Sequence, residues 1–276
     1  MTIPRTTAWS RNDARATNDL WYSVRTSLLV GVRVVAVWTT MTLAAVASVC
    51  VACLPFASWR HAVAVPTVRV IARGLLRALG VAVESRGPRP VLGALLVSNH
   101  LSWLDVVVAL AQWPCAFVAK REVRAWPVIG TLGEAIGVVW IDRSRARDVL
   151  RVIPALGDSL ARGRTVLLFP EGTTTGGYHL LPFRSALFEA AVRSDALVMP
   201  MAIGGTVRDG DVQALTWVGS ETLVRNINRL AALRGAQLSV HVGAPQLPLD
   251  DRKATARSAQ RAVLRRCQRI ARMRWA

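Results

Sequence analysis

The stretch Ala94-Leu-Leu-Val-Ser-Asn-His-Leu-Ser-Trp-Leu-Asp105 joins an apolar run that predicts a β-strand to a pattern that predicts a helix. Its histidine, His100, is one of only four in the 276-residue chain. A neutral imidazole can take a proton from an alcohol if another group holds its second nitrogen. Asp105 can be that group if it lies in the first helical turn and folds back. The alternative is structural: Ser102-x-x-Asp105 matches a capping box, in which Asp105 only starts the helix.

Alternating strand and helix patterns around this stretch predict an α/β fold with a largely parallel sheet flanked by helices. A short strand over 81–85 and a turn at 87–90 precede it. We expect strands at 93–98, 115–119, 136–141, 165–169, 197–203 and 238–242, and helices at 103–112, 145–161, 183–193 and 221–234.

The N-terminal region contains a long uncharged segment, from Val34 to Leu54. As a helix it would be about 30 Å long, which matches a bilayer core. It is too long and begins too far from Met1 for a cleavable signal peptide. We expect membrane insertion, either spanning or as half of a re-entrant hairpin; a moderately hydrophobic core helix is the alternative.

Two basic helices are predicted outside the sheet region. In the first, over 61–79 and ending at Gly80, Arg69, Arg73 and Arg77 share one face. That face suits lipid headgroups or plain solvent. The second begins at Arg252 and carries a stripe at every fourth residue, which suits an anionic surface or solvent. The stripe consists of Arg257, Arg261, Arg265 and Arg269.

These patterns divide the chain into four parts. We expect a flexible basic N-terminus (1–33), a membrane-associated helical segment (34–80), an α/β domain (81–250) and a basic C-terminal helix (251–276).

Composition favours a membrane-associated protein with anionic partners. The chain is 52 % hydrophobic and carries a net charge of +18, although arginine excess can also reflect coding bias. No nucleic-acid module signature, P-loop or G-x-G-x-x-G is present. The four cysteines predict no disulfide framework. Cys50-x-x-Cys53 lies in an apolar run without a second pair, which argues against a metal site.

Three further predicted strands end in polar or proline-containing segments. They read Gly137-Val-Val-Trp-Ile-Asp-Arg143, Val166-Leu-Leu-Phe-Pro-Glu-Gly-Thr173 and Val198-Met-Pro-Met-Ala-Ile203. Because ligands gather at the carboxyl ends of strands in open α/β sheets, these segments and His100 predict one shared site.

Together the four segments, in this order, resemble the glycerolipid acyltransferase family, over about residues 90–210. The residues that carry the resemblance are Asn99, His100, Ser102 and Asp105, then Gly137, Ile141, Asp142 and Arg143, then Phe169 to Thr173, and finally Pro200.

The resemblance implies a membrane-bound enzyme that moves an acyl group from coenzyme A or acyl carrier protein to a lysolipid hydroxyl. His100 would be the base and Asp105 would orient it, with no acyl-enzyme, cofactor or metal. No serine lies in a G-x-S-x-G context, which agrees. The enzyme would sit on an anionic membrane, the cell inner membrane, with its site facing the cytoplasm. The implied substrate-binding residues are Asn99, Ser102, Lys120, Arg143, Glu171, Gly172, Thr173, Arg184 and Pro200.

The sequence departs from the family pattern at Thr174, where phosphate-accepting members commonly carry arginine. Arg184 is a candidate to replace that arginine. We expect 1-acylglycerol-3-phosphate as acceptor, since this activity is the commoner one; the alternative is lyso-ornithine lipid, whose enzymes share the Glu-Gly-Thr-Thr pattern. Alternatives of other classes are a non-catalytic basic membrane-binding protein and a lipid hydrolase.

Overall fold

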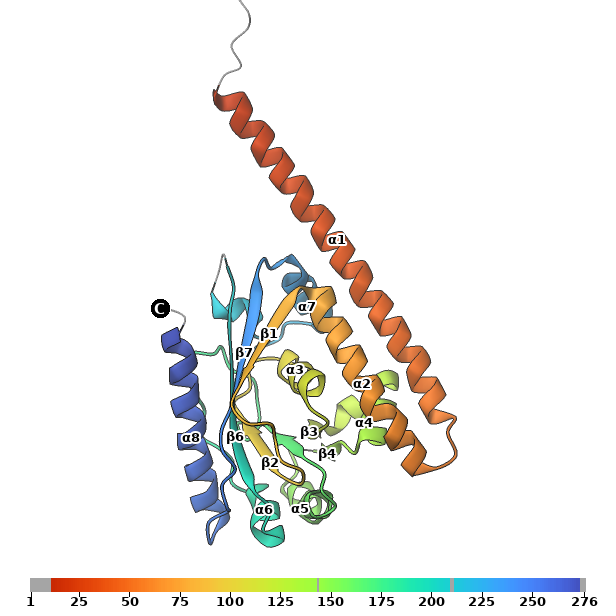
Figure 1. Ribbon diagram of the computed structural model, residues 1–276, viewed down its shortest axis with the longest axis vertical. Coiled ribbons are helices and arrows are strands. Elements are labelled where there is room, and N and C mark those ends of the chain that lie inside the picture. Colours follow the sequence, from red (N-terminus) through yellow and green to blue (C-terminus); the bar gives the residue numbers. More distant parts are fainter. Residues whose placement is uncertain (1–10, 143, 209–210, 274–276) are drawn as a thin grey trace, which may run out of the picture.

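A seven-stranded sheet with helices on both faces forms the body of the protein (Figure 1). The computed structural model describes residues 11–142, 144–208 and 211–273. All neighbouring strands are parallel except β6 and β7, which confirms the predicted largely parallel sheet. In their order across the sheet the strands are β1 (Val81–Arg86), β7 (Ala236–Val242), β6 (Val198–Thr206), β2 (Leu95–Ser98), β5 (Val166–Leu168), β3 (Ala116–Lys120) and β4 (Val139–Ile141).

The helices fall into two groups, one on each face of the sheet. Those that share the first apolar core are α1 (Arg11–Ala52), α2 (Ala57–Leu79), α3 (Leu104–Gln112), α4 (Pro127–Ile136) and α7 (Leu223–Ala232). Those that share the second are α5 (Ala146–Ala161), α6 (Phe188–Ser194) and α8 (Arg252–Met273). Two short 3-10 helices, η1 (Arg121–Ala125) and η2 (Val212–Leu215), complete the described elements.

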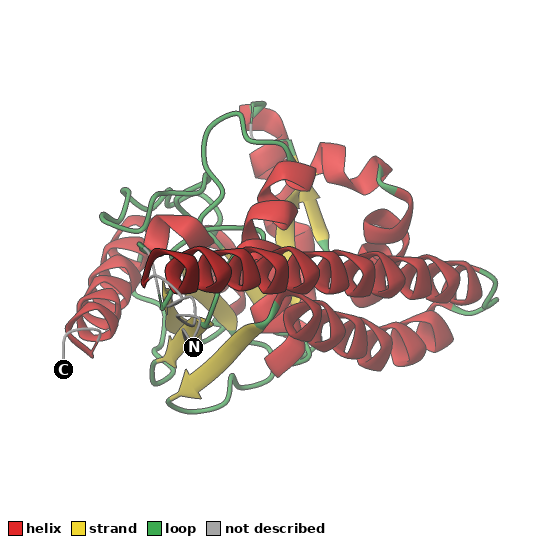
Figure 2. Cartoon of the chain, turned by 90° about the horizontal axis from the view of Figure 1, so that it is seen from above, coloured by secondary structure: helices red, strands yellow, loops and turns green. Residues whose placement is uncertain are grey.

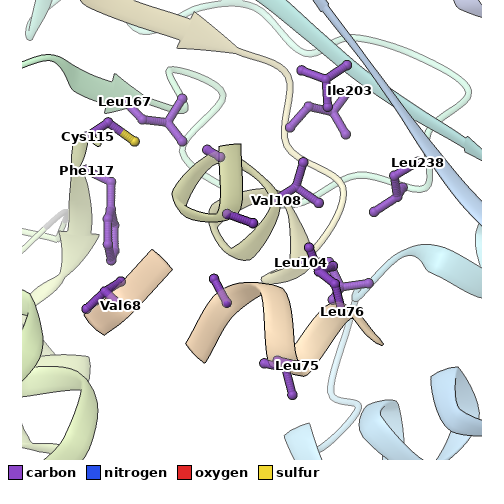
Figure 3. Close-up of a cluster of buried hydrophobic side chains, with 14 of the residues drawn as sticks. Val68, Leu75, Leu76, Leu104, Val108, Cys115, Phe117, Leu167, Ile203 and Leu238 are labelled. Atoms are coloured by element: carbon purple, nitrogen blue, oxygen red, sulfur yellow. The ribbon is translucent and has the colours of Figure 1, made fainter. Parts of the chain in front are cut away.

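The central strand β2 is buried on both faces, which explains its unbroken apolar sequence. Leu95 and Val97 belong to the α8 side, and Leu96 to the α2 side. Figure 3 shows α3 between the sheet and α2, with Leu104 and Val108 pointing into the apolar cluster. The sheet and α2 therefore clamp the helix that carries Asp105.

Two element boundaries differ from the sequence-based expectation. The strand predicted from residue 136 begins only at Val139, because Pro127 starts a helix that Gly137 ends in the left-handed conformation (φ 86°). That helix, α4, was not predicted. The helix predicted from residue 183 begins only at Phe188, after a segment without regular secondary structure.

Helices α1 and α2 form a hairpin, and Figures 1 and 2 show them side by side. Since α1 begins at Arg11, the expectation of a flexible segment over 1–33 is wrong for residues 11–33. Among the described residues, one helix, over Ser27–Ala52, is long and apolar enough to cross a membrane, and only 22 % of its most apolar window is buried. Its exposed apolar side chains include Leu28, Val32, Val35, Trp38, Leu43, Val46 and Val49.

Polar contacts hold this hairpin to the domain at both ends. The Arg33 guanidinium donates to the carbonyl oxygens of Ala231 (3.0 Å) and Leu233 at the end of α7. The His61 Nδ1 lies 2.9 Å from the Ala135 carbonyl oxygen at the end of α4. These contacts hold the part of α1 from Arg33 onward against the domain, while its N-terminal part projects beyond the sheet and the other helices (Figure 1).

The arginine face of α2 has a role that neither expected interpretation included. The Arg69 Nη2 donates to the Gln112 carbonyl oxygen (2.8 Å), and the Arg73 Nε donates to that of Ala111 (3.0 Å). These carbonyls end α3, where a helix leaves acceptors unpaired and favours positive charge. Arg69 is half-buried, and Arg73 and Arg77 are exposed. The basic face thus fixes α3 from its C-terminal end.

Replacing Arg33 by alanine tests the attachment of the hairpin. Hydrogen bonds to charged groups contribute about 1.5–3 kcal/mol, so Arg33→Ala should lower the free energy of unfolding by roughly 2 kcal/mol. Chemical unfolding in detergent micelles measures it. Arg162→Ala, which removes an exposed arginine at the end of α5, is the control; equal stabilities of the two variants would contradict the assignment.

Candidate active site

The residue before His100 fixes the end of β2 to its neighbour β6. The Asn99 Nδ2 donates to the Ile203 carbonyl oxygen, and the Asn99 Oδ1 accepts from the Ile203 N–H, both at 2.8 Å. This pair of bonds extends the β2–β6 ladder by one side chain beyond Ser98. Asn99 is buried and positions the turn through these bonds, and the substrate contact expected for it stays a prediction.

The His100 and Asp105 side chains meet. The His100 Nδ1 lies 2.8 Å from the Asp105 Oδ2, and the side chains are 14 % and 1 % exposed. The same oxygen accepts from the N–H groups of Leu101 (2.6 Å) and Ser102 (2.9 Å). Because this oxygen serves as an acceptor for both amides, the contact favours the neutral tautomer in which Nδ1 donates to it and Nε2 keeps its lone pair. Among the described residues the Asp105 Oδ1 has no hydrogen-bond partner.

The capping box expected as the alternative for Ser102-x-x-Asp105 forms only in part, since α3 has Trp103 as its N-cap and the Ser102 hydroxyl does not accept from the Asp105 N–H. The Asp105 carboxylate bonds the Ser102 N–H, as the acid of a capping box does, while it also holds the imidazole. The Ser102 Oγ accepts from the Leu104 N–H (3.4 Å) and is buried. Ser102 therefore shapes the turn, and the substrate contact expected for it does not fit this burial.

Phe169 contacts the imidazole directly. Its ring stacks on His100 with centroids 4.0 Å apart and planes 17° apart. The following loop adds a bond from the Thr175 N–H to the His100 carbonyl oxygen (2.9 Å), and Trp217 N–H donates to that of Leu101 (2.9 Å). None of these three roles was predicted, because ring stacking and backbone bonds leave no motif.

The buried carboxylate of Glu171 ties two loops together. Its Oε1 accepts from the His100 N–H (2.7 Å) and its Oε2 from the Leu181 N–H (2.9 Å). The residue is 2 % exposed, and burial raises the pKa of its carboxyl group, against the opposing effect of the two backbone bonds. Glu171 therefore positions His100 and the loop at Leu181, and the headgroup contact expected for it stays a prediction.

Three expected binding residues, Gly172, Thr173 and Arg184, lie at or beside the turn that follows Glu171. Gly172 has φ 76°, a left-handed conformation that favours glycine, and a Cβ there would lie 3.0 Å from the Arg184 Nε. Thr173 and Arg184 are exposed. The Thr174 hydroxyl donates to the Trp217 carbonyl oxygen. Arg184 therefore lies beside Gly172, as its proposed replacement role requires.

A cavity of about 100 Å³ opens beside this turn. Among the described residues that line it, Arg184 is the charged one. The lining residues are Val118, Ile141, Val149, Leu168, Phe169, Pro170, Gly172, Arg184, Ala186 and Leu187.

Two of the remaining expected residues have other contacts in the structure, and the third lies outside the described residues. Lys120 is exposed at the end of β3, with its Nζ 3.2 Å from the Glu122 Oε1. Pro200 is buried within β6 opposite Val97, and its carbonyl oxygen accepts from the Gly243 N–H. Its expected ligand role does not fit that position. Arg143 lies outside the described residues.

A polar network behind the turn was also not predicted. The Trp103 Nε1 donates to the Asn226 Oδ1 (2.8 Å), and the Asn226 Nδ2 donates to Glu221 Oε2 (2.8 Å). The Arg229 Nη2 lies 2.8 Å from the same Glu221 oxygen. Trp103 and Asn226 are far apart in the chain, so no local pattern could join them.

Stability at low pH tests this network. The hydrogen bond from Arg229 lowers the pKa of Glu221 to about 2, whereas an unfolded glutamate titrates near about 4.3. The folded pKa is the lower one, so the stabilisation is present above about pH 4.3 and is lost as pH falls towards about 2. The Tm advantage of wild type over Glu221→Gln should therefore shrink between about pH 5 and about pH 3. Asp158→Asn, at an exposed position, is the control; an advantage that stays constant with pH would contradict the assignment.

The described residues contain no group of three or more His, Cys, Asp or Glu side chains that could hold a metal ion. Cys50 and Cys53 are exposed thiols, and Cys115 is a buried one.

Comparisons with known proteins agree on one family. The model of the Acyltransferase family matches residues 81–204. The chain is 40 % identical over 135 residues to 1-acyl-sn-glycerol-3-phosphate acyltransferase of Neisseria meningitidis, which covers 48 % of this chain and 53 % of that protein. The matched region thus spans about half the length of the Neisseria relatives.

A longer match links the chain to lyso-ornithine lipid O-acyltransferase of Pseudomonas aeruginosa, at 40 % identity over 194 residues, 68 % of this chain and 73 % of that protein. The fold is similar to the crystal structure of 1-acyl-sn-glycerophosphate acyltransferase PlsC from Thermotoga maritima, with a TM-score of 0.66 and 17 % identity over 90 % of this chain and 97 % of the other. The chain that holds His100 against Asp105 at the end of β2 therefore belongs to the acyltransferase family.

Proposed function

We propose that the protein transfers a fatty acyl group from a thioester to the hydroxyl of a lysolipid, with His100 as the base. The contact between the His100 Nδ1 and the Asp105 carboxylate carries this proposal. It fixes the tautomer in which Nε2 accepts a proton, and the carboxylate stabilises the imidazolium that results. The membership in the acyltransferase family supports the same chemistry.

The proposed reaction needs no covalent intermediate. The His100 Nε2 takes the proton of the lysolipid hydroxyl as its oxygen attacks the thioester carbonyl carbon. The carbon–sulfur bond then breaks, and the imidazolium returns the proton to the leaving thiolate. Phe169 and Glu171 hold the imidazole and the backbone of His100 in place during both transfers.

We propose lyso-ornithine lipid as the first candidate acceptor, which reverses the order expected from the sequence alone. The position of the phosphate-binding arginine is Thr174, and its hydroxyl is bonded to the Trp217 carbonyl oxygen. The match to a lyso-ornithine lipid enzyme also covers more of the chain, 68 % against 48 %. Arg184 remains beside Gly172 to bind one anionic group, such as the carboxylate of an amino-acid headgroup.

Lysophosphatidate is the second candidate acceptor. Arg184 also favours it, since a guanidinium binds phosphate as well as carboxylate.

The hairpin is the proposed membrane anchor. The exposed apolar side of α1, with Trp38 and the Phe56–Trp59 pair at the hairpin turn, suits one leaflet of a bilayer. Since Arg33 and His61 hold the hairpin against the domain, we propose insertion into one leaflet rather than a crossing. The inner membrane, with His100 on the cytoplasmic side, is the proposed location.

Acylation of lysolipids by purified protein tests the base. His100→Ala should remove turnover, and Asp105→Asn should lower kcat by about 10⁴, because it disturbs the tautomer while leaving one oxygen for the turn amides. Asp158→Asn should keep wild-type turnover. A His100→Ala variant with wild-type kcat would disprove the proposal.

An acceptor panel tests the headgroup. Wild type should use lyso-ornithine lipid with a higher kcat/KM than lysophosphatidate. Thr174→Arg adds a charged donor and should shift the ratio about tenfold towards lysophosphatidate, as expected for one charged hydrogen bond. Thr174→Val, which only removes the bond to Trp217, is the matched control. A wild-type preference for lysophosphatidate would make the second candidate the acceptor.

A further inference from the structure

A helix outside the part of the chain that the family model matches contacts the turn that carries His100. The match ends at residue 204, whereas Asn226 belongs to α7, and its side chain is fully buried. The Asn226 Oδ1 accepts a hydrogen bond from the Trp103 Nε1 (2.8 Å). Trp103 is the N-cap residue of α3 and lies in the turn between β2 and that helix. This bond therefore connects α7 with the turn in which the base meets its carboxylate.

The Asn226 side chain is held in one orientation. Its Nδ2 donates to the Thr216 carbonyl oxygen (3.1 Å) and to the Glu221 Oε2 (2.8 Å), while its Oδ1 accepts from Trp103. An asparagine amide has one acceptor end and one donor end, and here each end meets the opposite kind of group. A reversed amide would bring its donor against the indole N–H. A replacement that lacks either function would leave a buried polar group unpaired.

A second contact from the same segment reaches the turn two residues earlier. The Trp217 N–H donates to the Leu101 carbonyl oxygen (2.9 Å), and the Trp217 Nε1 donates to the Glu221 carbonyl oxygen (2.7 Å). The Leu101 N–H donates in the other direction, to the Asp105 Oδ2. The turn is thus bonded at Leu101 and at Trp103 to the segment that contains Glu221 and α7.

Charged groups fix α7 in place. The Arg229 Nη2 lies 2.8 Å from the Glu221 Oε2 and also donates to the Thr216 carbonyl oxygen (2.7 Å). Because the hydrogen bond from Arg229 lowers the pKa of Glu221 to about 2, this carboxylate is ionised near neutral pH. At the other end of α7, the Arg33 guanidinium donates to the Ala231 carbonyl oxygen (3.0 Å). The helix is therefore a fixed support for the turn.

We propose that Asn226 is a positioning residue, which acts through Trp103 to aim the His100 Nε2 at the lysolipid hydroxyl. The inference rests on the proposed function. Other side chains hold His100 itself, whereas the residues that follow it are bonded to α7 and to the segment before α7. A displacement of about 1 Å at a reacting group can lower a rate about 100-fold. Loss of this support should therefore lower kcat and leave lipid binding intact.

Turnover by the full-length protein, measured per folded molecule, tests the proposal with two variants. Asn226→Leu removes both ends of the amide at similar volume. Trp103→Phe removes only the indole N–H and keeps the other two bonds of Asn226. Each variant should lower kcat between about tenfold and about 100-fold and leave the KM for the lysolipid within about twofold of wild type. Asn228→Leu, at an exposed asparagine of the same helix, is the matched control and should keep the wild-type kcat.

The double variant shows whether the effect passes through the bond between the two side chains. Asn226→Leu/Trp103→Phe should be no slower than the slower single variant, because both changes break the same contact. Losses that multiply would overturn the inference. So would a wild-type kcat in the single variants, or a KM that rises alone, since Asn226 would then serve only stability or binding. If Asn226→Leu does not fold, the kcat of Trp103→Phe decides alone.

Hydrogen exchange separates this inference from the proposed function. The amides of residues 100–102, followed by mass spectrometry in detergent micelles, should exchange about tenfold faster in Asn226→Leu than in wild type, because the turn opens more often. The amides of β5 serve as the internal reference, and Asn228→Leu should match wild type. If no pair of donor and acceptor supports acylation, the proposed function fails, and the exchange still reports on the turn. Equal exchange in Asn226→Leu and wild type would overturn the inference.

Discussion

One carboxylate oxygen, Asp105 Oδ2, organises the site. It accepts from the His100 Nδ1 and from the N–H groups of Leu101 and Ser102. A single buried acceptor thus sets the imidazole tautomer and the backbone of the turn together. Burying the Asp105 carboxylate costs free energy, and the three hydrogen bonds offset that cost. The conformation of the turn and the tautomer of His100 therefore depend on each other. The arginines of α2 extend this control by fixing the far end of α3.

Glu171 is a second buried carboxylate that accepts hydrogen bonds from the backbone, and it connects two loops. Its two oxygens each accept one backbone N–H, from His100 and from Leu181. Glu171 is almost fully buried. A side chain that cannot accept hydrogen bonds at this position would therefore leave the N–H groups of His100 and Leu181 unpaired. An acidic residue in a family motif can therefore be essential for geometry without touching substrate.

The sequence was informative where chemistry is local. The period-two and apolar runs predicted every strand of the sheet, and the short spacing of His100 and Asp105 predicted their contact. It was uninformative where partners come from distant segments, as for Phe169 on His100 and Asn226 on Trp103. The family resemblance named Asn99 and Pro200 as ligand-binding residues, and it gave no sign that Asn99 would bond Ile203 or that Pro200 would lie within β6. The helix α4 was missed because its apolar residues merge into the following strand, and only Gly137 marks the boundary.

The attachment of the hairpin to the domain at Arg33 and His61 affects how the enzyme would meet its lipid substrate. A catalyst held flat on a surface, as the proposed one-leaflet anchor requires, meets its lipid by lateral diffusion in two dimensions. Its turnover would then depend on the mole fraction of lysolipid in the leaflet rather than on the bulk concentration. The product would be released into the same sheet of lipids from which the acceptor came, so no lipid would need to leave the bilayer during a catalytic cycle.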